Sequence, residues 1–231
     1  MEDRLPRMKA YKFRSASQIA FALDIIINQR LFCSDWKMLN DPMEGMFVFS
    51  HQSSDEYDYK KEIQKIIEHK KRLKICSLSM TFDCHLLWAH YAGGFDGCAV
   101  EVEIPDDHPS VKITEYRGVF AHLAMPNGES PEVLANQVLS SKYQEWSYER
   151  EVRILQSEEW FNLEDPVKRV IAGHRMPPAL FEAMNIICNS MGIDFRRTGI
   201  GDEGIDADYV EPSSVLTPNN KFNWSALKKS H

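Results

Sequence analysis

Two glutamates and an arginine occupy alternate positions in the segment WSYEREVRIL, and they could together support charge-based chemistry. If the segment is a strand, the side chains of Glu149, Glu151 and Arg153 project from one face while their neighbours project from the other. A nearby guanidinium favours the ionised form of a carboxyl group, so we expect Arg153 to keep both glutamates deprotonated at neutral pH. The segment also has helical spacing, in which Glu149 and Arg153 would be an ordinary surface pair four residues apart.

A second predicted strand, KRLKICSLSM, carries polar side chains, and a short helix after it carries aromatic ones. Ser77 and Ser79 lie two residues apart, so both hydroxyls are expected on one face of that strand. The short helix predicted for HLLWAHYAGG carries Trp88, His90 and Tyr91, which could stack on a ring or hydrogen-bond to it. The commoner role for such residues is in the core, with the imidazole hydrogen-bonded.

Three other segments have polar residues with a structural and a functional interpretation. In AYKFRS, residues 10–15, Lys12 and Arg14 alternate onto one strand face, where they either grip a phosphate or are solvated. NDPMEG, residues 40–45, has the composition of a turn and most simply forms a structural corner. The acidic run at 201–211 lacks the spacing of a calcium-binding loop and is expected to be a solvated loop.

These side chains must be positioned by alternating strands and helices, and we predict one α+β domain over residues 1–231 with a loosely held tail at 216–231. Besides the strands at 10–15, 71–80 and 146–155, the alternating pattern of GCAVEVEIP predicts a strand at 97–105. Helical spacing is found in five further segments: 15–31, 53–73, 85–94, 130–146 and 177–192.

The composition of the chain limits its class. The 231 residues carry a net charge of −7, which argues against a broad phosphate-binding surface. The five cysteines have no CxxC spacing and no secretory leader precedes them, so we expect reduced thiols and a cytoplasmic protein. The longest apolar run near the start is interrupted by Asp24 and is too short to span a bilayer, so no membrane association is expected. The sequence has no Walker A loop, GxSxG elbow, HExxH motif or zinc-type Cys/His spacing.

Taken together, the segments YKFR, NDPMEG, CSLS, LLWAHYAGGFDGCAVEVE and KYQEWSYEREVRIL resemble the motifs of a large bacterial family of uncharacterised proteins. That family carries YKYR, NDPxE, SxS, LMWAHYxxxxxG and K…WxYExExR in this order. The resemblance covers roughly residues 10 to 190. The chain departs from the pattern at Met43, where an aromatic residue is usual, and at Leu87, where the family has Met.

The family in turn resembles the ADP-ribosyltransferase superfamily of the Arg–Ser–Glu type. That superfamily has a basic residue on its first strand, an S-x-S element on a later one and an E/Q-x-E pair on another; YKFR, SLS and EREVRIL occur here in the same order. The resemblance implies an ADP-ribosyltransferase-like α+β fold, with split mixed or antiparallel sheets flanked by helices. It also implies NAD as the substrate whose nicotinamide–ribose bond is cleaved, by a mono-ADP-ribosyltransferase or an NAD glycohydrolase.

By the same resemblance, Glu151 would hydrogen-bond to the ribose 2′-hydroxyl and stabilise an oxocarbenium-like transition state. Glu149 would orient or deprotonate the acceptor, and Ser77 would position Glu151 or the ribose. Either Arg14 or Lys12 would hold the diphosphate. The residues expected to bind NAD are Lys12, Arg14, Ser79, Trp88, His90, Tyr91 and Arg153, of which Trp88 or Tyr91 would stack on nicotinamide, and no metal site is expected.

The resemblance is compatible with three acceptors: a protein, a nucleic acid or water. The resemblance suggests bacterial toxin or anti-phage defence biology, with an antitoxin or another protein as a partner. Two alternatives stay open. One is a non-enzymatic module that binds a nucleotide or a protein. The other is a metal-dependent hydrolase or nuclease with Asp41, Glu44, His90, Glu149 and Glu151 as ligands.

Overall fold

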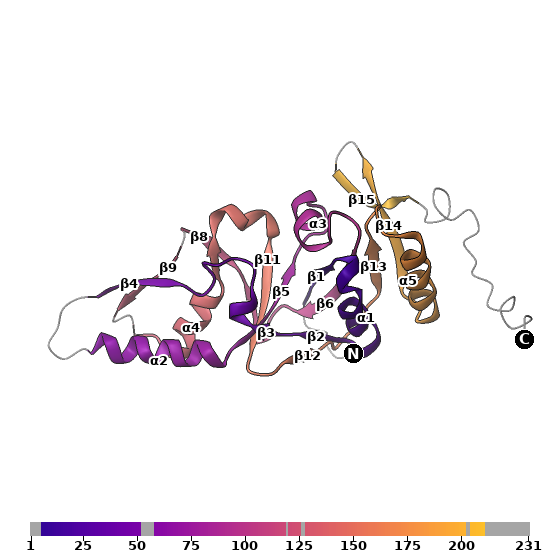
Figure 1. Ribbon diagram of the computed structural model, residues 1–231. Coiled ribbons are helices and arrows are strands. Elements are labelled where there is room, and N and C mark those ends of the chain that lie inside the picture. The colour runs from indigo at the N-terminus through magenta and orange to yellow at the C-terminus, as the bar shows by residue number, and fades with distance from the viewer. Residues whose placement is uncertain (1–5, 52–57, 119, 126–127, 202–203, 211–231) are drawn as a thin grey trace, which may run out of the picture. The chain divides into compact units, whose positions relative to one another are not determined.

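The computed structural model describes residues 6–51, 58–118, 120–125, 128–201 and 204–210 (Figure 1). Helices and mixed sheets alternate along the chain, which confirms the predicted α+β class. The described residues divide into two compact units: unit 1 comprises 6–8, 30–51, 58–80, 104–118, 120–125 and 128–162, and unit 2 comprises 9–29, 81–103, 163–201 and 204–210. Each unit is therefore built from separate parts of the sequence. The tail predicted at 216–231 lies outside the described residues.

Unit 1 contains an antiparallel sheet in the order β5-β11-β7, with β3 paired to β5. Three two-stranded ribbons complete its strands: β4 with β9 and β10 with β8 are parallel, and β12 with β2 is antiparallel. The strands of unit 1 are β2 (Arg30–Phe32), β3 (Ser34–Asp35), β4 (Phe47–His51), β5 (Lys74–Ser79), β7 (Val111–Ile113), β8 (Glu115–Arg117), β9 (Ala121–Met125), β10 (Ser141–Tyr143), β11 (Glu151–Gln156) and β12 (Trp160–Asn162).

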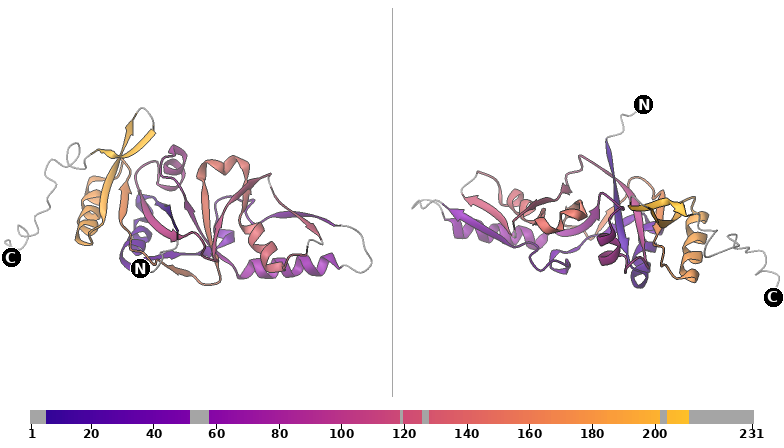
Figure 2. Two further views of the ribbon diagram at one scale, coloured as in Figure 1. Left: turned by 180° about the vertical axis from the view of Figure 1, so that it is seen from behind. Right: turned by 90° about the horizontal axis from the view of Figure 1, so that it is seen from above.

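Two helices of unit 1, α2 (Tyr59–Arg72) and α4 (Pro131–Leu139), lie beside the β4–β9 ribbon, as both Figure 1 and Figure 2 show. The carboxylate of Asp58 caps α2, and Ser130 caps α4 with Pro131 in its first turn. Their apolar faces and the ribbon form one hydrophobic cluster, which contains Ile66, Ala121, Leu123, Leu134, Ala135 and Val138. Two short 3₁₀ helices, η2 (Trp36–Met38) and η3 (Gln144–Glu149), belong to the same unit.

Unit 2 has the strand order β15-β14-β13-β6-β1, with β13 parallel to β14 and the pairs β14–β15 and β13–β6 antiparallel. Its hydrophobic cluster includes Tyr11, Phe13, Leu87, Trp88, Ala99 and Ile171. Helix α5 packs along β14, as both figures show. The elements that lie wholly or mainly in unit 2 are β1 (Arg7–Arg14), η1 (Ala16–Gln18), α1 (Ile19–Asn28), α3 (His85–Tyr91), β6 (Cys98–Pro105), β13 (Arg169–Ala172), α5 (Pro178–Ser190), β14 (Asp194–Gly201) and β15 (Gly204–Val210).

Two sequence-based expectations about these elements are wrong in detail. The helix predicted at 130–146 ends at Leu139 and is followed by β10 and η3. Within the acidic run at 201–211, Gly204–Val210 is not a loop but forms strand β15, paired with β14. As for the membrane, no helix among the described residues is long and apolar enough to cross one.

Candidate functional site

Strands β5 and β11 bring the predicted serines and carboxylates onto one face of the unit 1 sheet. In their antiparallel register Ser77 lies opposite Arg153, and Ser79 lies opposite Glu151. Directly opposed residues project from the same face, so these four side chains share one face, as each strand's alternation predicted. The other face is apolar and carries buried residues such as Val152.

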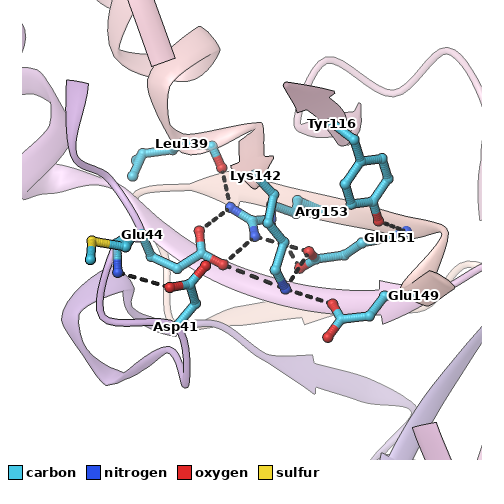
Figure 3. Close-up of polar contacts among 9 residues, drawn as sticks. Asp41, Glu44, Tyr116, Leu139, Lys142, Glu149, Glu151 and Arg153 are labelled. Atoms are coloured by element: carbon cyan, nitrogen blue, oxygen red, sulfur yellow. Dashed lines mark hydrogen bonds and ion pairs between the residues drawn. The ribbon is translucent and has the colours of Figure 1, made fainter. Parts of the chain in front are cut away.

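Arg153 is the centre of this face and is completely buried, with 0% of its surface exposed. Its Nε and one Nη hold both oxygens of Glu151 at 2.9 Å, and its two Nη atoms hold both oxygens of Glu44 at 2.6 and 2.8 Å (Figure 3). The remaining Nη1 bond goes to the carbonyl oxygen of Leu139 at 2.6 Å. A guanidinium has five N–H donors, so every donor of Arg153 has an acceptor.

A second cation, Lys142 of β10, lies between the carboxylates of the cluster (Figure 3). Its Nζ is 2.5 Å from an oxygen of Glu149, 3.2 Å from an oxygen of Glu151 and 3.6 Å from an oxygen of Glu44. The side chain of Lys142 is only 6% exposed, and its Nζ also lies 5.0 Å from the centre of the Trp146 ring. Lys142 therefore links the two glutamates that the sequence had singled out.

The backbone of Glu151 is fixed by Tyr116. The Glu151 N–H donates to the Tyr116 hydroxyl at 2.7 Å, and Tyr116 lies beside Lys142 in the parallel β8–β10 ribbon. Burial raises the pKa of Tyr116 to about 12, so its hydroxyl stays protonated at neutral pH and can donate onward.

The electrostatics of this cluster fix the charge of Glu151. Burial alone would raise the pKa of its carboxyl group, but the charges of Arg153 and Lys142, with hydrogen bonds from Arg153 and Ser77, lower that pKa to about 2. Burial also lowers the pKa of Lys142 and Arg153, but the negative charges of the neighbouring glutamates outweigh burial, so both pKa values are raised. This direction agrees with the role predicted for Arg153 at Glu151, whereas the carboxylate of Glu149 is paired with Lys142.

Five charged residues make up this buried cluster: Glu44, Lys142, Glu149, Glu151 and Arg153. Three carboxylates face two cations, so the formal charge of the cluster is −1. In a region removed from water, such a charge attracts a cation or a developing positive charge more strongly than it would in bulk solvent.

Glu149 is not on the strand, contrary to the expectation that it alternates with Glu151. It is the last residue of η3, and Arg150 then adopts a left-handed conformation with φ 45° before β11 begins at Glu151. The Ser79 hydroxyl donates to the Glu149 carbonyl at 2.6 Å, and the Met80 N–H donates to the Arg150 carbonyl at 2.9 Å. These bonds hold the turn, so the Glu149 carboxylate reaches the cluster from a different element.

The remaining predicted residues belong to unit 2. Lys12 and Arg14 are half-buried and alternate with core residues on β1, as expected, and Arg14 donates to the Phe13 carbonyl. His90 is exposed and Tyr91 is half-buried beside the hydrophobic cluster of unit 2. The assignment of these four residues to NAD stays a prediction from the resemblance.

Trp88 occupies the core of unit 2, which is the structural alternative for this residue. It is 0% exposed, its indole N–H donates to the Phe82 carbonyl at 2.8 Å, and its ring stacks on Phe95 with centroids 5.3 Å apart. Phe13 packs edge-on against the same ring at 5.3 Å. A ligand could stack on Trp88 only by displacing core side chains, so the role expected for Trp88, stacking on nicotinamide, is wrong for this arrangement.

The donor set gives little support to the metal-dependent alternative. Ammonium and guanidinium groups fill the space between the carboxylates of Glu44, Glu149 and Glu151, and the oxygen of Asp41 accepts the Met43 N–H. Within the described part of the chain, no group of three or more His, Cys, Asp or Glu side chains is placed to hold a metal ion.

Three residues of the site, Glu44, Tyr116 and Lys142, were not selected from the sequence as parts of the NAD centre. Lys142 stands within the KYQEWSYEREVRIL motif that carries the family resemblance, and Glu44 stands within NDPMEG, whose turn role was correctly anticipated through the Asp41 bond to the Met43 N–H. The sequence signal for Lys142 and Glu44 was that each is a charged residue inside one of these motifs. Tyr116 had none, because it lies in a short strand outside every motif.

Comparison with known proteins does not name this site. No protein-family model matches the chain, and no curated protein or solved structure matches it significantly.

Proposed function

We propose that unit 1 carries the carboxylate centre of an NAD-dependent mono-ADP-ribosyltransferase or NAD glycohydrolase. One observation carries the proposal: an ionised Glu151 shares a strand face with Ser77, and Lys142 joins its carboxylate to that of Glu149. Two of the three motif elements that resemble the transferases, SLS and EREVRIL, thus meet in one cluster, whereas YKFR lies in unit 2. The identity of NAD rests on that resemblance.

In the proposed reaction, the nicotinamide–ribose bond breaks and positive charge develops on the ribose. Glu151 accepts the 2′-hydroxyl hydrogen bond and stabilises that charge, which the formal −1 of the cluster also favours. Glu149 orients the acceptor nucleophile or accepts its proton, and Ser77 positions Glu151. Lys142 lies between the two carboxylates, so the reaction requires its ammonium group to yield that place to the ribose and the acceptor.

The test is nicotinamide release from NAD, measured chromatographically with and without a cell lysate that supplies acceptors. We expect the wild type to release nicotinamide and Glu151→Gln to abolish release. Glu145→Gln removes an exposed glutamate of the same segment and should retain full activity. Glu149→Gln should lose transfer to the acceptor while keeping part of the hydrolysis. Circular dichroism and thermal unfolding of each variant separate a lost activity from a lost fold.

Absence of nicotinamide release by the wild type under all these conditions would refute the proposal. A Glu151→Gln variant that cleaves NAD at the wild-type rate would refute the role of Glu151 alone.

A binding module without catalysis is the second candidate, and one observation favours it. The side chain of Glu151 is 3% exposed and both of its oxygens bond to cations, as in a structural ion network. NAD that binds, by calorimetry, and is recovered intact would support this candidate over the transferase.

A further inference from the structure

A groove on unit 1, separate from the Ser77 face, is lined mainly by apolar side chains with three lysines among them. Its volume is about 560 Å³, within the range typical of small-molecule sites. The aromatic lining consists of Trp36 of η2, Phe47 of β4 and Phe120. The lysines are Lys37, Lys70 and Lys71. Neither Ser77 nor the two glutamates of the proposed reaction line it, although Glu44, which is paired with Arg153 and Lys142 of the charge cluster, does. The groove is therefore a different site from the proposed NAD centre, and the two share Glu44.

Lys70 is the notable member of this lining, because it is a buried lysine with 6% of its surface exposed. Its Nζ donates to the carbonyl oxygen of Gly45 and lies 4.2 Å from the centre of the Trp36 ring and 5.6 Å from that of Phe47. Within the described residues, no carboxylate lies at ion-pair distance from Lys70. Its ammonium group is therefore held by a carbonyl and by aromatic faces.

The other charges of the groove do not supply a counter-ion. Lys37 is exposed, and its Nζ lies 5.8 Å from the same Trp36 ring, while Lys71 follows Lys70 on α2. The carboxylate of Glu44 lines the groove but is bound in both oxygens by Arg153. The groove is consequently positive, with three cations and one neutralised anion.

Buried charges in proteins are generally paired, since burying an isolated ammonium group is costly. Two effects reduce that cost here. Lys70 lies in the last turn of α2, where the helix dipole favours a cation, and aromatic faces attract cations. Burial and the charge of Lys37 still lower the pKa of Lys70, and an anion beside the ammonium group would favour its charged form. Because Lys70 is largely removed from water, that attraction is stronger than at an exposed lysine.

We propose that this groove binds a small aromatic anion, whose planar body packs against Trp36, Phe47 and Phe120 and whose carboxylate or phosphate pairs with Lys70. Lys37 and Lys71, at the exposed side, add attraction for the same group. The combination of apolar lining and a few convergent polar groups is typical of ligand pockets. The charge on Lys70 distinguishes this ligand from a neutral aromatic one.

Three probes of one shape test the ligand class at pH 7: 2-naphthoate, 2-naphthyl phosphate and neutral 2-naphthol. We expect one or both anions to bind, measured by calorimetry, and 2-naphthol to bind at least tenfold more weakly. The stronger anion identifies carboxylate or phosphate as the natural group. The indole N–H signal of Trp36, assigned with Trp36→Phe, should shift on titration and so locate the probe.

Two lysine variants test the residue. Lys70→Met keeps the apolar stem and should weaken anion binding roughly 10- to 100-fold, the range for a lost charge-assisted hydrogen bond. Lys60→Met removes an exposed lysine of the same helix outside the groove and should leave binding unchanged. If Lys70→Met fails to fold, Lys37→Met, at an exposed position, should still weaken the anions and spare 2-naphthol.

The proposal is overturned if no anion binds at millimolar concentration, if 2-naphthol binds as well as the anions, or if the Trp36 signal does not move. A wild-type dimer in sedimentation that Lys70→Met dissociates would overturn it too, because a second copy of the chain would then cover the groove.

Discussion

The pKa of Glu151 gives a quantitative prediction about acid stability. That pKa falls from its ordinary value of 4.5 to about 2 in the folded protein. At about 1.4 kcal/mol per pKa unit, the folded environment favours the ionised carboxylate by about 3 kcal/mol. Glu151 is almost fully buried, so solvent screening does little to reduce this figure.

The direction of the effect follows from proton binding. The unfolded chain takes up a proton at Glu151 at higher pH than the folded chain does, so this contribution to stability is complete above about pH 5 and is lost as the pH falls towards 2. By pH 3 the loss amounts to about 2 kcal/mol from this single group. A Glu151→Gln variant has no such proton to bind and lacks this part of the pH dependence.

The assay is urea unfolding of both proteins at pH 7, 5, 4 and 3, followed by circular dichroism, with Glu145→Gln as the control at an exposed position. We expect the wild type and the control to lose about 2 kcal/mol more than Glu151→Gln between pH 7 and pH 3. Parallel curves for wild type and Glu151→Gln would refute the reasoning, because they would mean that Glu151 is not held ionised by buried cations.

Four further substitutions have defined outcomes in thermal and urea unfolding. Arg153→Met leaves two buried glutamates without their main partner and should destabilise the protein by about 3–5 kcal/mol; a loss below about 1 kcal/mol would contradict the buried pairing. Gly45→Ala should cost about 1–3 kcal/mol, since φ is +69° and the new Cβ would lie 2.8 Å from a Trp36 ring carbon. Gly128 also has a positive φ, of 78°, but a Cβ there would meet no atom within 4 Å. Gly128→Ala should therefore cost less stability than Gly45→Ala. Arg197 is buried with no hydrogen bond from its three guanidinium nitrogens to the described residues, and its guanidinium lies 3.9 Å from the centre of the Phe181 ring. Arg197→Leu should therefore leave stability unchanged or raise it, and a clear loss would mean that the contact with Phe181 outweighs the cost of burying the charge.

Features within single strands could be predicted from the sequence. Alternation alone placed Ser77 with Ser79, and Glu151 with Arg153, on common faces, and the β5–β11 register agrees. Such predictions succeed because the direction of a strand side chain depends only on whether its position is odd or even. The register of the two strands then places their polar faces on the same side of the sheet.

Features that depend on distant residues could not be predicted. Glu149 leaves the strand because Arg150 adopts a left-handed conformation, in a turn held by Ser79 from 70 positions away. Trp88 has the composition of a binding-site aromatic, yet tertiary packing encloses it. In both cases a local pattern left two roles open, and contacts from elsewhere in the chain decided between them.

The bond between Glu44 and Arg153 also has a consequence for how the protein is made. The two residues are 109 positions apart, so a ribosome adding about 5–20 residues per second completes Arg153 roughly 5–20 s after Glu44. Closing so long a loop has an entropic cost that slows folding. Until Arg153 is synthesised, the NDPMEG segment can form its turn, but Glu44 has no guanidinium group to pair with. The nascent first half of unit 1 therefore cannot complete its polar centre, and that centre closes only when the strand that carries Glu151 has been synthesised.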